Sequence, residues 1–153
     1  MVSGQIVGGW LSSEKIDLVT HEQGAYGILI RLDRRLNTTI GSLGGVTLSS
    51  GSYLYLGSAY GSGGLRARLR RHLRVKKSLH WHIDRVTAQG KITNLFVSPH
   101  GLECGLVRQV LRVPGVNFPV KGFGSSDCKQ CPAHFLRIPD PLNTSIQTIL
   151  SVR

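Results

Sequence analysis

The stretch from Tyr53 to His72 limits the folds open to this chain more than any other part of it. It reads YLYLGSAYGSGGLRARLRRH, with a glycine-rich turn between two regular patterns. The alternation before the turn places Tyr53 and Tyr55 on one face and leucines on the other, which predicts a strand over 53–57. Leucines at 65, 69 and 73 recur every fourth residue after the turn and predict a helix over 65–74. A strand followed at once by a helix indicates a mixed fold.

Apolar and alternating runs elsewhere predict the remaining elements of an α+β (mixed α/β) domain. Strands are expected at 25–32, 91–97 and 135–138, a hairpin at 38–43 and 46–49 around two glycines, and helices at 81–88 and 103–112. We expect one domain over residues 24–140, preceded by a peripheral N-terminal segment at 1–23 and followed by a C-terminal tail at 141–153.

The charge of the chain indicates an anionic partner. Lys and Arg number 19 against 8 Asp and Glu, a formal charge of +11. A charge of this size repels itself within the folded chain and favours an anionic partner, with nucleic acid first and an acidic membrane surface second. There is no run of 18 apolar residues, no signal-peptide pattern and only three cysteines. We therefore expect no membrane span, no disulfide framework and a cytoplasmic location.

Residues 66–77 concentrate that charge in the predicted helix. They contain seven Arg and Lys residues and no acid, so pairing within the helix is impossible and nucleic-acid phosphates are the favoured counter-charge. A basic face exposed only to solvent is the alternative. Arg68 and His72 lie four residues apart and share one face, where they are available for chemistry. The predicted nucleic-acid contacts are Arg66, Arg70, Arg71, Arg74, Lys76, Lys77 and His82.

The glycine-rich turn at 57–64 does not match a nucleotide site. It lacks the Gly-Lys-Ser/Thr ending of a P-loop and the spacing of a dinucleotide fingerprint, so we expect no nucleotide cofactor. Backbone N–H groups at a helix N-terminus could still receive a phosphate. A flexible strand-to-helix connection is the alternative interpretation.

Several short motifs occur in an order that resembles the GIY-YIG nuclease superfamily. They are GAY at 24–26, YLG at 55–57, Arg68 with His72, and Glu103 on a predicted helix. More narrowly, GAYGILI, GSYLYLGSA, RHL, HWHID and FGSSDC resemble the small Uri-type endonuclease branch. Ala25 and Leu56 replace the isoleucines of the superfamily motifs. Asn117 is the candidate for the late asparagine of the superfamily.

The resemblance implies a small, mainly antiparallel three-stranded sheet flanked by helices, here with an extra hairpin. It also implies an endonuclease that hydrolyses DNA phosphodiester bonds with Mg²⁺ or Mn²⁺, in repair, recombination or defence. Glu103 would hold the metal and Arg68 would clamp a phosphate oxygen. Tyr26 would accept a proton from the attacking water beside Tyr55 and His72. His72 is the alternative base because imidazole titrates near neutrality.

Two other readings of the function stay open. One is a non-catalytic nucleic-acid-binding module on the same scaffold, and the other is an RNA-directed protein. The HWHID segment at 80–84 is equally open. Its polar groups could line a nucleic-acid groove, hold the basic helix in place through Asp84, or supply part of a two-histidine, one-carboxylate iron site, the least favoured of the three.

Four potential soft metal ligands lie in the second half of the chain. Cys104 precedes the motif CKQCPAH, which contains Cys128, Cys131 and His134. Cys/His sets of this kind bind structural zinc, although reduced buried thiols are the commoner outcome. Asp127, after two serines, could instead cap a helix.

Overall fold

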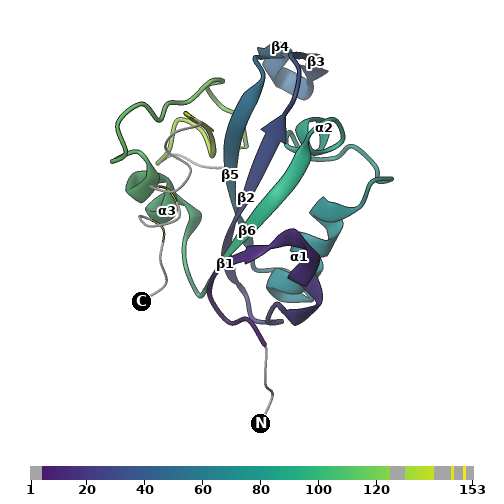
Figure 1. Cartoon of the computed structure of the whole chain (residues 1–153), viewed down its shortest axis with the longest axis vertical. Coiled ribbons are helices and arrows are strands. Elements are labelled where there is room, and N and C mark those ends of the chain that lie inside the picture. Colours follow the sequence, from purple (N-terminus) through teal and green to yellow (C-terminus); the bar gives the residue numbers. More distant parts are fainter. Residues whose placement is uncertain (1–4, 125–129, 140–145, 147–149, 151–153) are drawn as a thin grey trace.

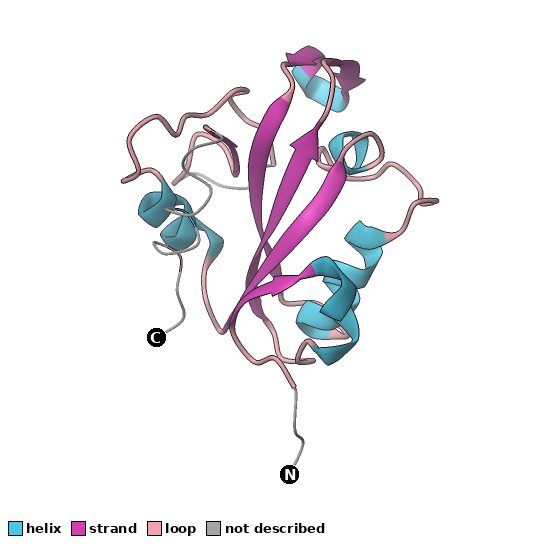
Figure 2. Ribbon diagram, viewed as in Figure 1, coloured by secondary structure: helices cyan, strands magenta, loops and turns pink. Residues whose placement is uncertain are grey.

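The computed structural model describes residues 5–124, 130–139, 146 and 150. Its centre is an antiparallel sheet of five strands in the order β1-β6-β2-β5-β7 (Figure 1). These strands are β1 (Gly9–Ser12), β2 (Gly24–Leu32), β5 (Gly51–Ala59), β6 (Lys91–Pro99) and β7 (Phe135–Ile138). A separate hairpin is formed by β3 (Leu36–Ile40) and β4 (Gly44–Leu48). Figure 2 shows how helices and loops surround these strands.

Helices lie on both faces of the central sheet (Figure 1). They are α1 (Gly64–Leu73), α2 (Asp84–Thr87) and α3 (Glu103–Val110), with 3₁₀ turns η1 (Ser13–Leu18) and η2 (Gly41–Leu43). Leucines of α1 and Val86 of α2 pack with Tyr53 and Tyr55 in one core cluster. Leu106 and Val107 of α3 pack with Leu54 and Leu56 in a second cluster on the opposite face. The expected division between the faces of this strand is therefore confirmed.

The α+β class predicted from the sequence is confirmed. The three strands that the resemblance implies are β6, β2 and β5, and the short strands β1 and β7 widen this centre to five. Both faces of β2 are covered, which explains why GAYGILIRL reads as an almost continuous apolar run. The extra hairpin is present, but its turn is η2 at 41–43, and Gly44 is already paired with Ile40. Gly41 (φ 42°) and Gly44 (φ 74°) both need the left-handed region that favours glycine.

The N-terminal part of the chain is not peripheral. Strand β1 pairs with β6, with Trp10 opposite Phe96, and Leu11 is buried in the core. Val19 is also buried, and its carbonyl accepts a hydrogen bond from Arg66 Nε at 2.6 Å. The described part of residues 1–23 therefore completes the sheet and supports α1.

The expected domain end at residue 140 is too early. Ile146 and Leu150 are buried in the cluster that contains α3. The Leu150 carbonyl also accepts a hydrogen bond from Trp10 Nε1 at 3.0 Å. These contacts bring the two ends of the chain into one domain. None of the described helices has the length and apolar character needed to cross a bilayer.

Candidate active site

A pocket of about 690 Å³ opens between α1, the loop before α2, and the first turn of α3. Its lining includes Tyr26 from β2, Tyr55 from β5, Arg68 from α1 and Glu103 from α3. The fold thus brings to one cavity four of the residues for which the sequence predicts chemistry. The fifth, His72, lies behind Tyr26 and does not line the cavity.

The two tyrosines meet because their strands are adjacent. In the β2–β5 register, Tyr26 lies opposite Gly57 and Ile28 lies opposite Tyr55, and the two tyrosine rings have centroids 6.3 Å apart. A Cβ at Gly57 would lie only 2.6 Å from Tyr26 Oη and 3.0 Å from Tyr55 Cε2. Glycine is therefore required at position 57 to leave room for the two phenol groups.

Arg68 is fixed at the edge of the pocket by two contacts. Its Nη1 donates a hydrogen bond to the Ser58 carbonyl at 2.9 Å. Its guanidinium also lies over the Trp81 ring, 4.6 Å from the ring centroid, as in cation–π pairs. The helix that carries it begins at Gly64, where a Cβ would lie 2.0 Å from the His21 carbonyl oxygen. The glycines of this turn therefore allow α1 to pack closely on residues 21–22.

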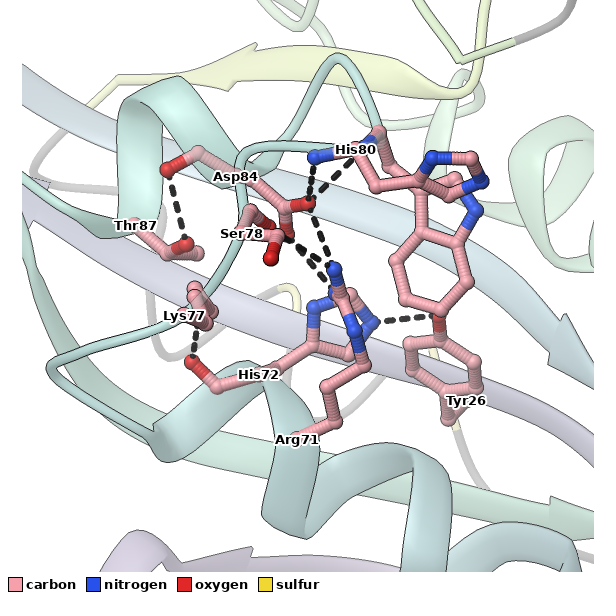
Figure 3. Close-up of polar contacts among 9 residues, drawn as sticks. Tyr26, Arg71, His72, Lys77, Ser78, His80, Asp84 and Thr87 are labelled. Atoms are coloured by element: carbon pink, nitrogen blue, oxygen red, sulfur yellow. Dashed lines mark hydrogen bonds and ion pairs between the residues drawn. The ribbon is translucent and has the colours of Figure 1, made fainter.

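His72 is buried and bonded to Tyr26 (Figure 3). The Tyr26 Oη and His72 Nε2 atoms are 2.7 Å apart, and His72 Nδ1 has no partner among the described residues. Burial, followed by the charge of Lys77, lowers the pKa of His72 to about 3. The imidazole is therefore neutral at physiological pH, and the sequence-based expectation that it titrates near neutrality does not hold.

The tyrosines are held in their protonated form in the pocket. Burial raises the pKa of Tyr26 well above its usual value of 10, and Tyr55 acts in the same direction. Burial also raises the pKa of Tyr55 to about 12. Arg68 opposes both shifts through its positive charge. It is therefore the described side chain best placed to stabilise a phenolate here.

Asp84 holds the basic helix to the loop before α2 (Figure 3). The side chain is fully buried and accepts two hydrogen bonds from Arg71, both 2.9 Å long. It also accepts bonds from the backbone N–H groups of His80 (2.9 Å) and Trp81 (2.8 Å). Burial alone would raise the pKa of Asp84, but these bonds outweigh it and lower the pKa to about 2. Of the three readings of HWHID, the structure therefore supports the one in which Asp84 holds the basic helix.

The loop residues beside Asp84 serve the pocket. The Trp81 ring contacts both Arg68 and Arg71, whose guanidinium carbons are 4.6 and 3.9 Å from its centroid. His82 lines the pocket, and its Nδ1 accepts a hydrogen bond from the Gly124 N–H at 2.9 Å. The carboxylate of an iron site would have to come from Asp84, whose oxygens are already engaged by Arg71 and two backbone N–H groups, so the iron reading has no support.

Most of the cations predicted to bind nucleic acid already have partners inside the protein. Arg71 pairs with Asp84, Arg66 donates to the Val19 carbonyl, and Arg70 forms an exposed ion pair with Asp17 at 2.6 Å. Lys77 Nζ donates to the His72 carbonyl at 2.6 Å. The prediction assigned all these cations to nucleic-acid binding, but Arg71 in particular is a structural residue. Arg74 and Lys76 are exposed.

Three of the four predicted soft ligands gather beside the pocket. One ligand atom from each of Cys104, Cys131 and His134 lies within 4.8 Å of the others. Cys104 and His134 also line the pocket. This cluster could hold a metal ion. The fourth candidate, Cys128, and the proposed cap Asp127 lie outside the described residues.

Two lining residues were missed as site residues by sequence reasoning. Trp81 was not marked as a site residue by the sequence, but it lies against Arg68 and lines the pocket. Arg108 adds a second cation to the pocket from α3. No sequence signal marked Arg108, because it lies outside the basic helix and follows Glu103 by five residues, which is not a same-face spacing.

The buried neutral His72 predicts a pH-dependent stability. The unfolded chain takes up a proton at this position near pH 6.5, whereas the folded chain does so only near pH 3. The neutral His72 ring therefore contributes fully to the free energy of unfolding above pH 6.5. This contribution is lost as the pH falls, at up to about 1.4 kcal/mol per pH unit. Urea unfolding between pH 6.5 and 4.5 should show a shallower decline for His72→Gln than for the parent protein. The exposed-site control His80→Gln should lose stability with falling pH as the parent does. If His72→Gln also lost as much stability as the parent, His72 would not be the buried neutral group proposed.

Comparison with known families accounts for most of the chain. A family model described as "Domain of unknown function DUF123" matches residues 25–152. The chain belongs to this family. The DUF123 match contains every described residue of the pocket and continues past residue 140, in agreement with the burial of Ile146 and Leu150. No curated protein and no solved structure matches this DUF123 chain significantly.

Proposed function

We propose that this DUF123 protein is a metal-dependent endonuclease of the GIY-YIG type that hydrolyses DNA phosphodiester bonds. The observation that carries the proposal is the convergence of Tyr26, Tyr55, Arg68 and Glu103 on one pocket, with His72 bonded to Tyr26. These residues are far apart in sequence and come from different elements. Their types match a phosphate clamp, a proton acceptor and a metal anchor.

The pocket residues fit a hard divalent cation. Protein sites for Mg²⁺ use one or two carboxylates and leave the remaining positions to water and phosphate. Among the described residues that line the pocket, Glu103 is the one carboxylate. Glu103 and the substrate phosphate would therefore hold Mg²⁺ or Mn²⁺. When bound, the cation supplies positive charge that stabilises the leaving oxygen and lowers the pKa of nearby hydroxyl groups.

His72 acts on the chemistry through Tyr26. Its Nδ1 is buried without a partner among the described residues. Buried N–H groups without an acceptor are rarer than acceptors without a donor, so we assign the ring hydrogen to Nε2. Nε2–H then donates to Tyr26 Oη across 2.7 Å and stabilises the phenolate. Tyr26 must first lose its own hydroxyl proton to solvent, and the resulting phenolate, and not His72, then accepts the proton of the attacking water.

Arg68 supplies the clamp for the phosphate. One of its guanidinium nitrogens is committed to the Ser58 carbonyl, and stacking on Trp81 fixes the plane of the group. A planar guanidinium held in this way can donate to a non-bridging oxygen and offset the charge that develops there. Arg108, across the pocket on α3, adds positive charge to the same space.

Incubation of the purified protein with supercoiled plasmid tests the function. We expect nicked and linear products with Mg²⁺ or Mn²⁺, and no product when the cation is chelated. Binding of labelled DNA is measured in parallel at increasing salt, because phosphate contacts weaken as salt rises. Salt-sensitive binding without cleavage would instead support the non-catalytic module. Cleavage of RNA but not DNA would redirect the proposal to RNA.

Replacement of the proton acceptor gives a sharper test of the mechanism. Tyr26→Phe should slow cleavage by roughly 10²–10⁴-fold, the usual contribution of a general base. Because the pKa of Tyr26 is raised by burial, the parent rate should also rise with pH above neutrality, and this rise should disappear in the variant. Tyr53→Phe is the matched control, since the Tyr53 hydroxyl donates to the Ser49 carbonyl and does not line the pocket. Equal rates for the two variants would refute this role for Tyr26.

A further inference from the structure

We propose that Cys104, Cys131 and His134 form a zinc site that ties the first turn of α3 to the start of β7. Cys104 Sγ and His134 Nε2, two ligand atoms of the cluster, are 3.6 Å apart. Zinc lies about 2.3 Å from a thiolate sulfur and about 2.0–2.1 Å from an imidazole nitrogen. A tetrahedral angle between these bonds places the two ligand atoms about 3.6 Å apart. The observed separation is the one that a shared zinc ion requires.

The ligand set selects zinc over the cation proposed for Glu103. Thiolate and imidazole are soft or borderline ligands, whereas Mg²⁺ requires oxygen ligands. Two thiolates would neutralise the charge of the ion. The three described residues would fill three of the four tetrahedral positions of zinc.

The surroundings of the cluster also suit a fixed site. Cys131 and His134 are both buried. The His134 imidazole makes a hydrogen bond with the backbone of Gly124. Zinc-bound histidines commonly use such a bond to fix the orientation of the ring.

The position of the site gives it a function in the pocket. Cys104 directly follows Glu103, and His134 directly precedes β7, so the ion would cross-link two segments that are 30 residues apart in sequence. The first turn of α3 has no side-chain cap hydrogen bond. Zinc would therefore anchor the turn that presents Glu103 to the pocket.

Metal content of the full chain tests the proposal. Protein purified from zinc-supplemented cells should contain about one zinc per chain by atomic emission. Cys131→Ser and His134→Ala should each reduce the content at least tenfold. His80→Ala is the matched histidine control, because His80 lines the pocket but lies outside the cluster, and it should retain the ion. Retention of zinc by Cys131→Ser, or a folded parent protein without zinc, would overturn the proposal.

Cobalt substitution gives a readout that does not depend on the stability of the variants. The parent protein, stripped of metal and loaded with Co²⁺, should show thiolate-to-cobalt charge-transfer absorption and the visible bands of tetrahedral cobalt. Glu103→Gln should show the same spectrum, because the carboxylate is not part of this site. A spectrum without thiolate bands from the fully reduced protein would contradict zinc binding. Both assays are independent of whether the protein cleaves DNA.

Discussion

Glu103→Gln is expected to abolish metal-dependent cleavage while leaving the fold intact. The substitution keeps the size of the side chain and removes the charge of the one carboxylate that lines the pocket among the described residues. A catalytic cation contributes several kcal/mol to the transition state, so we expect a loss of at least ~10³-fold in the single-turnover rate. The measurement is cleavage of labelled DNA at saturating Mn²⁺, with circular dichroism to confirm the fold.

The control for this prediction is Glu22→Gln. Glu22 is an exposed carboxylate that contacts His100 at 3.4 Å and does not line the pocket. The Glu22→Gln variant should cleave DNA at the same rate as the parent protein. If Glu103→Gln retained the parent rate and metal dependence, the cation would have to bind elsewhere and the proposed site would be wrong.

Asp84→Ala should have the largest effect on stability. The fully buried carboxylate receives two bonds from Arg71 and two from backbone N–H groups. Its removal leaves those donors unpaired beside a largely enclosed guanidinium. Breaking a buried pair on one side costs roughly 3–5 kcal/mol, and we expect a loss of this size in the free energy of unfolding, measured by urea titration at pH 7.

The chain offers a matched control for this second prediction. Asp17→Ala removes the same kind of carboxylate from an arginine of the same helix, but the Asp17–Arg70 pair is exposed. Exposed pairs contribute about 0–1 kcal/mol. Similar losses in Asp84→Ala and Asp17→Ala would show that the buried contact does not hold α1.

The pKa of about 2 for Asp84 also predicts that the contribution of this carboxylate to the free energy of unfolding is lost as the pH falls from about 4 to 2.

Local patterns were sufficient to locate the main elements of the fold. The alternation in residues 53–57 and the leucine spacing in 65–73 depend on short-range geometry, and the structure places β5 and α1 there. Strand β7 spans 135–138, as the apolar run predicted. The described N-terminal residues and Leu150 were misjudged because their burial depends on contacts with distant parts of the chain. Strand β1 (GWLS) shows neither an alternating pattern nor the apolar run that marks β7 (FLRI).

The residues of the candidate site were likewise predictable only in part. The order of the motifs indicated Tyr26, Tyr55, Arg68 and Glu103, and the structure brings them to one pocket. Apart from Arg68, the sequence could not distinguish the arginines of α1 from one another. Whether an arginine faces solvent or a buried acid depends on the path of the chain after the helix, and the partner of Arg71 lies 13 residues further on. Charge counting therefore overestimated the number of cations available to an anionic partner.

The central claim is that one pocket holds the cation at Glu103 beside Tyr26 and Arg68. The most direct test is a crystal of the protein soaked in Mn²⁺, with the ion located by its anomalous scattering. We predict a manganese peak at the Glu103 carboxylate, facing Tyr26 and Arg68. A zinc peak at Cys104, Cys131 and His134 would be separate from it. Manganese absent from Glu103, or bound only at surface carboxylates, would contradict the claim.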